Sequence, residues 1–180
     1  TDINMMYETD TLGYVEDEQV QVLQLPYKGD ELSMLVVLPK SKDAVAMQNL
    51  VKNLNTTQVS RWTETLEKKE ISLYLPKFKL EENYQMESLL TKMGMPIAFD
   101  SRADFSLFNE RLPLVVDSVI HKAVVEVDEK GTVAAAATAI VIDVTSASYN
   151  AEFEANHPFI FMIKDNKTDA ILFLGQVNKL

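Results

Sequence analysis

The feature that most limits the fold is a nearly continuous apolar run from Leu32 to Leu38. Such a run is typical of a strand that is buried on both faces. Before it, the segment from Gln19 to Leu25 places apolar residues at alternating positions, and Pro26-Tyr27-Lys28-Gly29-Asp30 between the two is typical of a turn. The pattern therefore predicts a β-hairpin with one fully buried strand.

The rest of the chain mixes helical and strand patterns. Apolar residues recur at helical spacing from Asp43 to Leu54. Thr56 or Thr57 is the expected N-cap of a second helix, in which Trp62 is expected to be a packing anchor rather than a ligand platform. A further apolar helical stripe, from Met86 to Met93, ends at Gly94 and is expected to be core rather than a binding groove. Strands are expected over residues 2–7, 71–80, 114–127, 158–163 and 170–176. This order predicts an α+β fold with a mainly antiparallel sheet.

Composition excludes several classes of protein. The 180 residues suffice for a domain with a real core, and the apolar fraction of 47% is that of a globular chain. The net charge of −10 disfavours nucleic acid and anionic membrane as partners. No run approaches the roughly 20 apolar residues of a membrane span. The chain contains no cysteine, so disulfides and cysteine–zinc sites are excluded.

In the stretch from Glu126 to Tyr149, the residue types in the middle differ from those at the two ends. Four alanines, Ala134 to Ala137, follow Gly131, and a β-branched run broken by Asp143 follows them. The even positions from 132 to 144 are uncharged and grow in bulk, so in a half-covered sheet this face points inward and Asp143 stays in water. An ordinary buried strand and an alanine-rich helix remain open alternatives on this pattern alone.

Catalytic motifs are absent from the sequence. There is no nucleophile elbow, no thiol, no His-Glu-x-x-His and no phosphate-binding loop. His121 lies in a strand pattern, where a hydrogen-bonded structural histidine is expected, and His157 precedes Pro158 where a strand begins. We therefore expect a protein that is not an enzyme and that has no cofactor and no metal site.

Four motifs, in chain order, resemble the serpin family. Residues 121–138 resemble the hinge of a serpin reactive-centre loop, and Phe153 to Ile163 resembles the C-terminal signature of the family. The segments 25–29, 32–34 and 38–39 resemble its central hairpin, and Leu75-Pro76-Lys77-Phe78 resembles the start of a strand that borders its main sheet. The resemblance implies the serpin fold, an α+β arrangement of mixed sheets and helices.

The resemblance also implies that the chain is incomplete. Residues 1–180 resemble the C-terminal part of a single serpin domain whose N-terminal half is missing, with residues 131–150 as the reactive-centre loop. The N-terminal half of the same serpin is therefore an expected partner. A lone half would leave sheet edges unpaired, so we do not expect it to form a stable monomer.

The function that the resemblance implies is suicide inhibition of a protease. The enzyme cuts the loop, and the freed loop inserts into the main sheet as a strand. Carried over by count from Gly131, the reactive bond joins Thr145 to Ser146, and Ser148-Tyr149 or Tyr149-Asn150 is the alternative. The residues that set specificity are Ile142, Asp143 and Val144. The expected target is an elastase-like serine protease, with chymotrypsin-like and cysteine proteases as further classes.

The hinge distinguishes an inhibitor from a non-inhibitory carrier, chaperone or binding protein. In the family, small uncharged hinge residues accompany inhibition, and the chain has them. The hinge residues carried over are Glu129, Gly131, Thr132, Ala134, Ala135, Ala136, Ala137 and Thr138. His121 matches the family's histidine that controls sheet opening. Sequons at Asn55 and Asn166 permit glycosylation, so we expect a secreted, extracellular glycoprotein, with an intracellular serpin as the alternative.

Overall fold

The computed structural model describes residues 4–109, 111–129 and 150–179. Its chain divides into two compact units. The first comprises residues 1–78 and 126–180, and the second comprises residues 79–125. Each unit is described by itself below.

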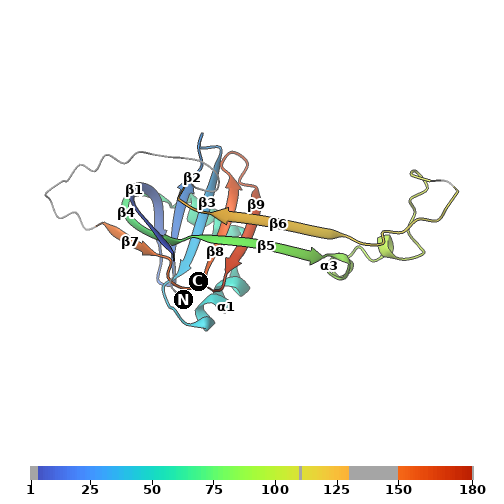
Figure 1. The fold of residues 1–180 in the computed structure, drawn as a ribbon, viewed down its shortest axis with the longest axis horizontal. Coiled ribbons are helices and arrows are strands. Elements are labelled where there is room, and N and C mark those ends of the chain that lie inside the picture. Colours follow the sequence, from blue (N-terminus) through green and yellow to red (C-terminus); the bar gives the residue numbers. More distant parts are fainter. Residues whose placement is uncertain (1–3, 110, 130–149, 180) are drawn as a thin grey trace. The chain divides into compact units, whose positions relative to one another are not determined.

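The first unit is built on one seven-stranded sheet with two helices (Figure 1). The strand order is β7-β4-β1-β2-β3-β8-β9, and all pairs are antiparallel except β4 with β7. The mainly antiparallel α+β prediction is therefore confirmed. The elements are β1 (Met5–Glu16), β2 (Val20–Pro26), β3 (Leu32–Pro39), α1 (Ala44–Asn53), α2 (Thr56–Glu64), β4 (Glu67–Pro76), β7 (Ala151–Glu154), β8 (Phe159–Asp165) and β9 (Ile171–Val177).

The predicted hairpin forms the centre of this sheet. β2 pairs with β3 from Val20 opposite Pro39 to Pro26 opposite Ser33. Between them, Gly29 has a φ of 91°, in the left-handed region that glycine enters without steric cost. β3 is buried along nearly its whole length, as the apolar run predicts. Its neighbour on the other side is β8, so β3 is paired on both edges as well as covered on both faces.

The first strand is longer than the sequence predicts. A short strand over residues 2–7 is expected, whereas β1 runs for 12 residues. Met5–Tyr14 pairs with β4, and Gly13–Glu16 pairs with β2. The hydrophobicity pattern did not predict the middle of this strand, because Glu8 to Thr11 are polar and exposed. Only the hydrogen bonds of the ladder specify their conformation.

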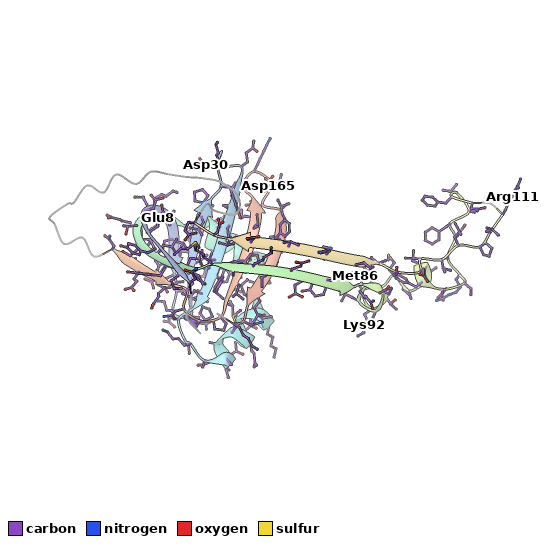
Figure 2. All side chains as sticks on the ribbon, viewed as in Figure 1. Glu8, Asp30, Met86, Lys92, Arg111 and Asp165 are labelled. Atoms are coloured by element: carbon purple, nitrogen blue, oxygen red, sulfur yellow. The ribbon has the colours of Figure 1, made fainter. Side chains whose placement is uncertain are left out.

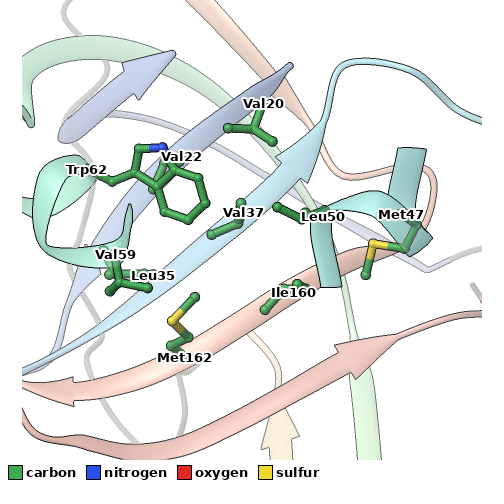
Figure 3. Close-up of a cluster of buried hydrophobic side chains, with 10 residues drawn as sticks. All are labelled: Val20, Val22, Leu35, Val37, Met47, Leu50, Val59, Trp62, Ile160 and Met162. Carbon is green, nitrogen blue, oxygen red and sulfur yellow. The ribbon is translucent and has the colours of Figure 1, made fainter. Parts of the chain in front are cut away.

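The two helices cover one face of the sheet (Figure 3). Trp62 of α2 is 4% exposed and packs against side chains of β2 and β3, which confirms it as a packing anchor. The N-cap of α2 is Asn55, whose side chain accepts a hydrogen bond from the Gln58 N–H, so the expectation of Thr56 or Thr57 was wrong by one or two residues. The cluster comprises Val20, Val22, Leu35, Val37, Met47, Leu50, Val59, Trp62, Ile160 and Met162.

Aromatic rings cover part of the opposite face of the sheet. Phe78 lies 5.7 Å from Phe159 and 5.4 Å from Phe161, between ring centroids. The Phe161 ring lies against Gly175 of β9, where an added Cβ would stand 2.4 Å from the ring. Glycine is therefore required at 175 by close approach of a neighbouring ring rather than by its backbone angles.

The second unit contains a two-stranded sheet of β5 (Phe78–Gln85) and β6 (Ile120–Val127), whose outermost residues belong to the first unit, with α3 (Glu87–Lys92) and the 3₁₀ helix η1 (Ile97–Phe99). β6 begins at Ile120, six residues later than the predicted strand. Gly94 ends α3 with a φ of 105°, as predicted. The apolar stripe of α3 was expected to be core, but no α3 residue is buried in this structure, and Leu89 is 48% exposed.

Candidate functional site

The candidate site is the segment between β6 and β7. Residues 130–149 lie outside the described residues, so the structure defines the two ends of this segment. The site residues predicted there are therefore not placed by the structure. They are Gly131, Thr132, Ala134, Ala135, Ala136, Ala137, Thr138, Ile142, Asp143, Val144, Thr145 and Ser146.

The N-terminal end of the segment is held by an ion pair. Lys77 Nζ contacts Glu129 Oε1, and the two side chains are 32% and 61% exposed. The backbone of Lys77 is itself fixed, because its N–H donates to the Asn4 carbonyl at 2.9 Å. Just before Glu129, the Val127 side chain is buried. Glu129, a predicted hinge residue, is therefore tied to the residue that follows β4.

The C-terminal end of the segment is held by a strand and a side chain. β7 pairs in parallel with β4 from Ile71 opposite Ala151 to Tyr74 opposite Glu154 (Figure 1). Phe153 is completely buried. At the start of β7, Asn150 Nδ2 donates to Glu70 Oε1 at 3.2 Å. β7 is thus anchored by one aromatic side chain and by a short ladder.

The C-terminal end of the segment is therefore attached to β4, and the N-terminal end to the residue that directly follows β4. Ile71 and Lys77 are six residues apart, about 20 Å at ~3.3 Å per residue of strand. The 20 residues from 130 to 149 have a contour length of about 70 Å when extended. The covalent length of the segment therefore exceeds the separation of its anchors about threefold.

The two histidines have different surroundings. His121 of β6 is exposed, and its ring stacks on Tyr84 with centroids 6.4 Å apart and planes 21° apart. His157 is half-buried just before β8, and its Nε2 donates to the Pro39 carbonyl at 2.6 Å. Its place ahead of a strand is as predicted. Among the described hydrogen bonds, the structural one is made by His157, so the structural role expected for His121 belongs to His157. Control of sheet opening by His121 stays a prediction.

The two sequons also differ. Asn55 is exposed and caps α2. Asn166 joins two turns: its Nδ2 donates to the Asp30 carbonyl at 2.8 Å, and its Oδ1 accepts from Ser33 Oγ at 2.6 Å. Figure 2 shows Asp30 and Asp165 at the same end of the sheet. Both side-chain amides are hydrogen-bonded, since Asn55 Nδ2 donates to the Asn53 carbonyl at 2.9 Å, and the two sequons differ in that Asn55 is exposed and Asn166 is half-buried.

Sequence reasoning missed the residues that hold the ends of the segment. Lys77 and Glu70 lie about 50 and 80 residues from Glu129 and Asn150 along the chain. Nothing in a local pattern marks such a pair, since it depends on which strand β7 joins. A parallel pairing of two strands this far apart carries no sequence signal of its own.

Comparison with known proteins identifies the family. The family described as Serpin (serine protease inhibitor) matches residues 1–180, and the chain belongs to it. Human Serpin B4 is 43% identical over 94% of this chain and 44% of its own length. The leukocyte elastase inhibitor of Sus scrofa is 38% identical over 98% of this chain and 48% of its own length. The chain thus spans about half the length of the curated relatives it matches.

Solved structures confirm the serpin fold. Uncleaved ovalbumin matches with a TM-score of 0.83 and 31% identity, over 99% of this chain and 44% of that one. A complex of thyroxine-binding globulin with thyroxine matches with a TM-score of 0.82 and 29% identity, over 97% of this chain and 46% of that one. The expectation of an α+β serpin fold is confirmed.

Proposed function

We propose that this chain is the C-terminal part of an inhibitory serpin, a suicide-substrate inhibitor of a serine protease. Residues 131–150 are its reactive-centre loop, and the bond from Thr145 to Ser146 is the one that the protease cuts. The observation that carries the proposal is a long segment whose C-terminal end pairs with β4 and whose N-terminal end is tied to Lys77, the residue that follows β4. Small, uncharged residues from Thr132 to Thr138 support it. Leukocyte elastase inhibitors among the relatives support an elastase-like target.

The sequence around the proposed bond supports the same class of target. Thr145 is small and β-branched, and residues 138–149 contain no lysine or arginine. A trypsin-like protease needs a basic residue before the cut, whereas a shallow apolar pocket accepts threonine. Chymotrypsin-like and cysteine proteases are the further target classes, and the set of proteases in the next experiment includes both.

A complex resistant to SDS tests the proposal. The full-length inhibitor is mixed with elastase, chymotrypsin, trypsin and a papain-like protease. We expect a covalent complex with elastase and none with trypsin. A protein that is cut by every enzyme without forming a complex is a substrate rather than an inhibitor.

A carrier is the second candidate, since thyroxine-binding globulin is among the structural matches. A carrier needs an enclosed, mostly apolar pocket. One cavity among the described residues, about 540 Å³, is lined by the turn residues Asp30, Glu31, Leu32, Asp165, Asn166 and Lys167. This charged lining does not suit an apolar ligand, so this cavity gives the carrier no support.

The N-terminal half of the same serpin is the proposed structural partner. On the edge strand β9, Ile171, Leu172, Phe173 and Leu174 are 41–58% exposed although they alternate between both faces. Apolar side chains on both faces of a strand are typical of a strand covered on both sides. We expect residues 1–180 expressed alone to show no cooperative unfolding as a monomer. A sharp transition of a monomer would contradict this.

The compartment is a separate proposal. No helix among the described residues is long and apolar enough to cross a membrane. The two sequons favour secretion of the protein, whereas its similarity to Serpin B4 and to leukocyte elastase inhibitors does not support secretion. If the protein is secreted, Asn55 is the acceptor that the structure favours over Asn166. Treatment with an N-glycosidase would then shift the band of the full-length protein, and Asn55→Gln would remove the shift. A band that does not shift in secreted material contradicts the glycan.

A further inference from the structure

β7 is a short strand for one that anchors a long segment. It has four residues, and β4 is its one neighbour in the described sheet. Two side chains, those of Glu70 and Gln21, add hydrogen bonds to this ladder. Glu70 accepts from Asn150, as described above. Gln21 acts from a strand that β4 and β1 separate from β7 in the sheet order.

Gln21 bridges β7 to the centre of the sheet. Its Nε2 donates to the Glu152 carbonyl of β7 at 3.0 Å and to the Tyr14 hydroxyl at 2.9 Å. The Glu152 carbonyl can only accept, so this nitrogen must carry the hydrogens. One amide group thus uses both of its N–H bonds to join β7 to β1.

A chain of side chains fixes the orientation of Gln21. The Tyr14 hydroxyl accepts a hydrogen bond from Gln21, whose side-chain nitrogen can only donate. Burial and the nearby Glu16 carboxylate raise the pKa of Tyr14, so the hydroxyl stays protonated. Glu16 is paired with Lys40, Nζ to Oε2 at 2.6 Å, and this hydrogen bond lowers the pKa of the carboxyl.

We propose that Gln21 is a positioning residue that keeps β7 in the sheet and so holds the C-terminal end of the reactive-centre loop. The inference rests on the proposed function for its consequence. An extended strand of 14 residues, Thr132 to Thr145, spans about 46 Å. The five residues from Ser146 to Asn150 reach about 17 Å, and the anchors lie about 20 Å apart along β4.

These lengths show why the position of β7 matters. Together, the 17 Å and the 20 Å fall short of the 46 Å that an inserted loop requires. An uncut loop can therefore insert fully only after β7 leaves the sheet. A contact that retains β7 keeps the uncut inhibitor active, whereas the cut loop no longer depends on it.

The test compares two glutamines of β2 in the full-length protein. Gln21→Met removes the donor to Glu152 and keeps the side-chain volume. Gln24→Met is the matched control, because Gln24 is also half-buried and donates to Ser33 Oγ at 3.2 Å rather than to β7. Gln21→Lys restores a donor of similar reach.

Hydrogen–deuterium exchange of the backbone amides of residues 151–154 measures directly how often β7 leaves the sheet. We expect exchange about fivefold faster in Gln21→Met, equal to about 1 kcal/mol at 1.4 kcal/mol per factor of ten. In Gln24→Met these amides should exchange at the wild-type rate. In Gln21→Lys their exchange rate should lie closer to the wild-type rate than it does in Gln21→Met. Equal exchange in Gln21→Met and Gln24→Met would overturn the proposal.

The rate at which the uncut inhibitor loses activity measures the consequence of β7 release for the loop. It should rise about fivefold in Gln21→Met alone, while the band on a denaturing gel stays intact. Unchanged activity loss together with faster exchange would overturn the link to the loop. If the wild type inhibits no protease and exchange still separates the two variants, the proposed function fails and the role of Gln21 stands.

Discussion

The ion pair between Lys77 and Glu129 gives the most direct perturbation of the hinge. Both side chains are partly exposed, at 32% and 61%, which is the range where an ion pair contributes about 0.2–1 kcal/mol. Glu129→Lys removes this attraction and places two ammonium groups together, a repulsion of similar size. We expect a cost of about 1 kcal/mol at low salt, a factor of about five in the population of states with a detached hinge.

The assay measures the rate at which the full-length, uncut protein loses the proposed inhibitory activity at low salt. Glu129→Lys and Lys77→Glu should each lose activity about fivefold faster than the wild type. The charge swap Lys77→Glu/Glu129→Lys should restore the wild-type rate, and Glu129→Gln should show a smaller change than Glu129→Lys. At 1 M salt the differences should shrink, because the screening length falls to about 3 Å.

The double variant decides the interpretation. If the pair acts through its charges, the swap recovers most of what each single change lost. A swap variant whose losses simply add would refute the reasoning, as would an effect of Glu129→Lys that persists unchanged at 1 M salt.

Three further predictions concern the sheet, all in the full-length protein. Gly175→Ala should lower the free energy of unfolding in urea by about 1–3 kcal/mol, because the new Cβ meets the buried Phe161 ring; an unchanged midpoint contradicts this. Phe153→Ala should cost about 3–5 kcal/mol in the same assay, since the side chain is fully buried; a loss below 1 kcal/mol would contradict its anchoring role. The carboxyl of Glu16 has a pKa held below its usual 4.5, first by the Lys40 hydrogen bond, so its contribution is present above pH 4.5 and lost as pH falls through the lowered value. Glu16→Gln should therefore differ from the wild type in stability at pH 6 and converge with it in acid; a constant difference contradicts the assignment.

Hydrophobic patterns predicted the centre of the sheet. β2, β3, β8 and β9 were each expected within a few residues of their bounds, because buried strands need apolar side chains on at least one face. The helix cover was predicted for the same reason. Trp62 was expected to anchor the packing, and it does.

Patterns failed where hydrogen bonds to a distant strand set the structure. The middle of β1 is polar and exposed, so the pairing with β4 alone explains its conformation. The start of β6 was placed too early, because residues 114–119 alternate but do not pair as a strand in the structure. Helix α3 shows the opposite case: its apolar stripe predicted burial that the structure does not show.

The reactive-centre residues came from local sequence and stay predictions, because residues 130–149 lie outside the described residues. The side chains that hold the ends of the segment did not come from local sequence. Glu70 lies on β4, Lys77 directly follows β4 and Gln21 lies on β2, and only the strand order brings them to the segment. Their contribution follows from topology, which a local pattern does not contain.

The reaction of the full-length protein with elastase, analysed by mass spectrometry, tests most directly the proposal that it is an elastase inhibitor cut at Thr145. The account predicts a complex that survives SDS and a released C-terminal peptide that begins at Ser146. No complex, or a complex whose released peptide begins at Tyr149 or Asn150, would contradict the assignment of the reactive bond to Thr145 and Ser146.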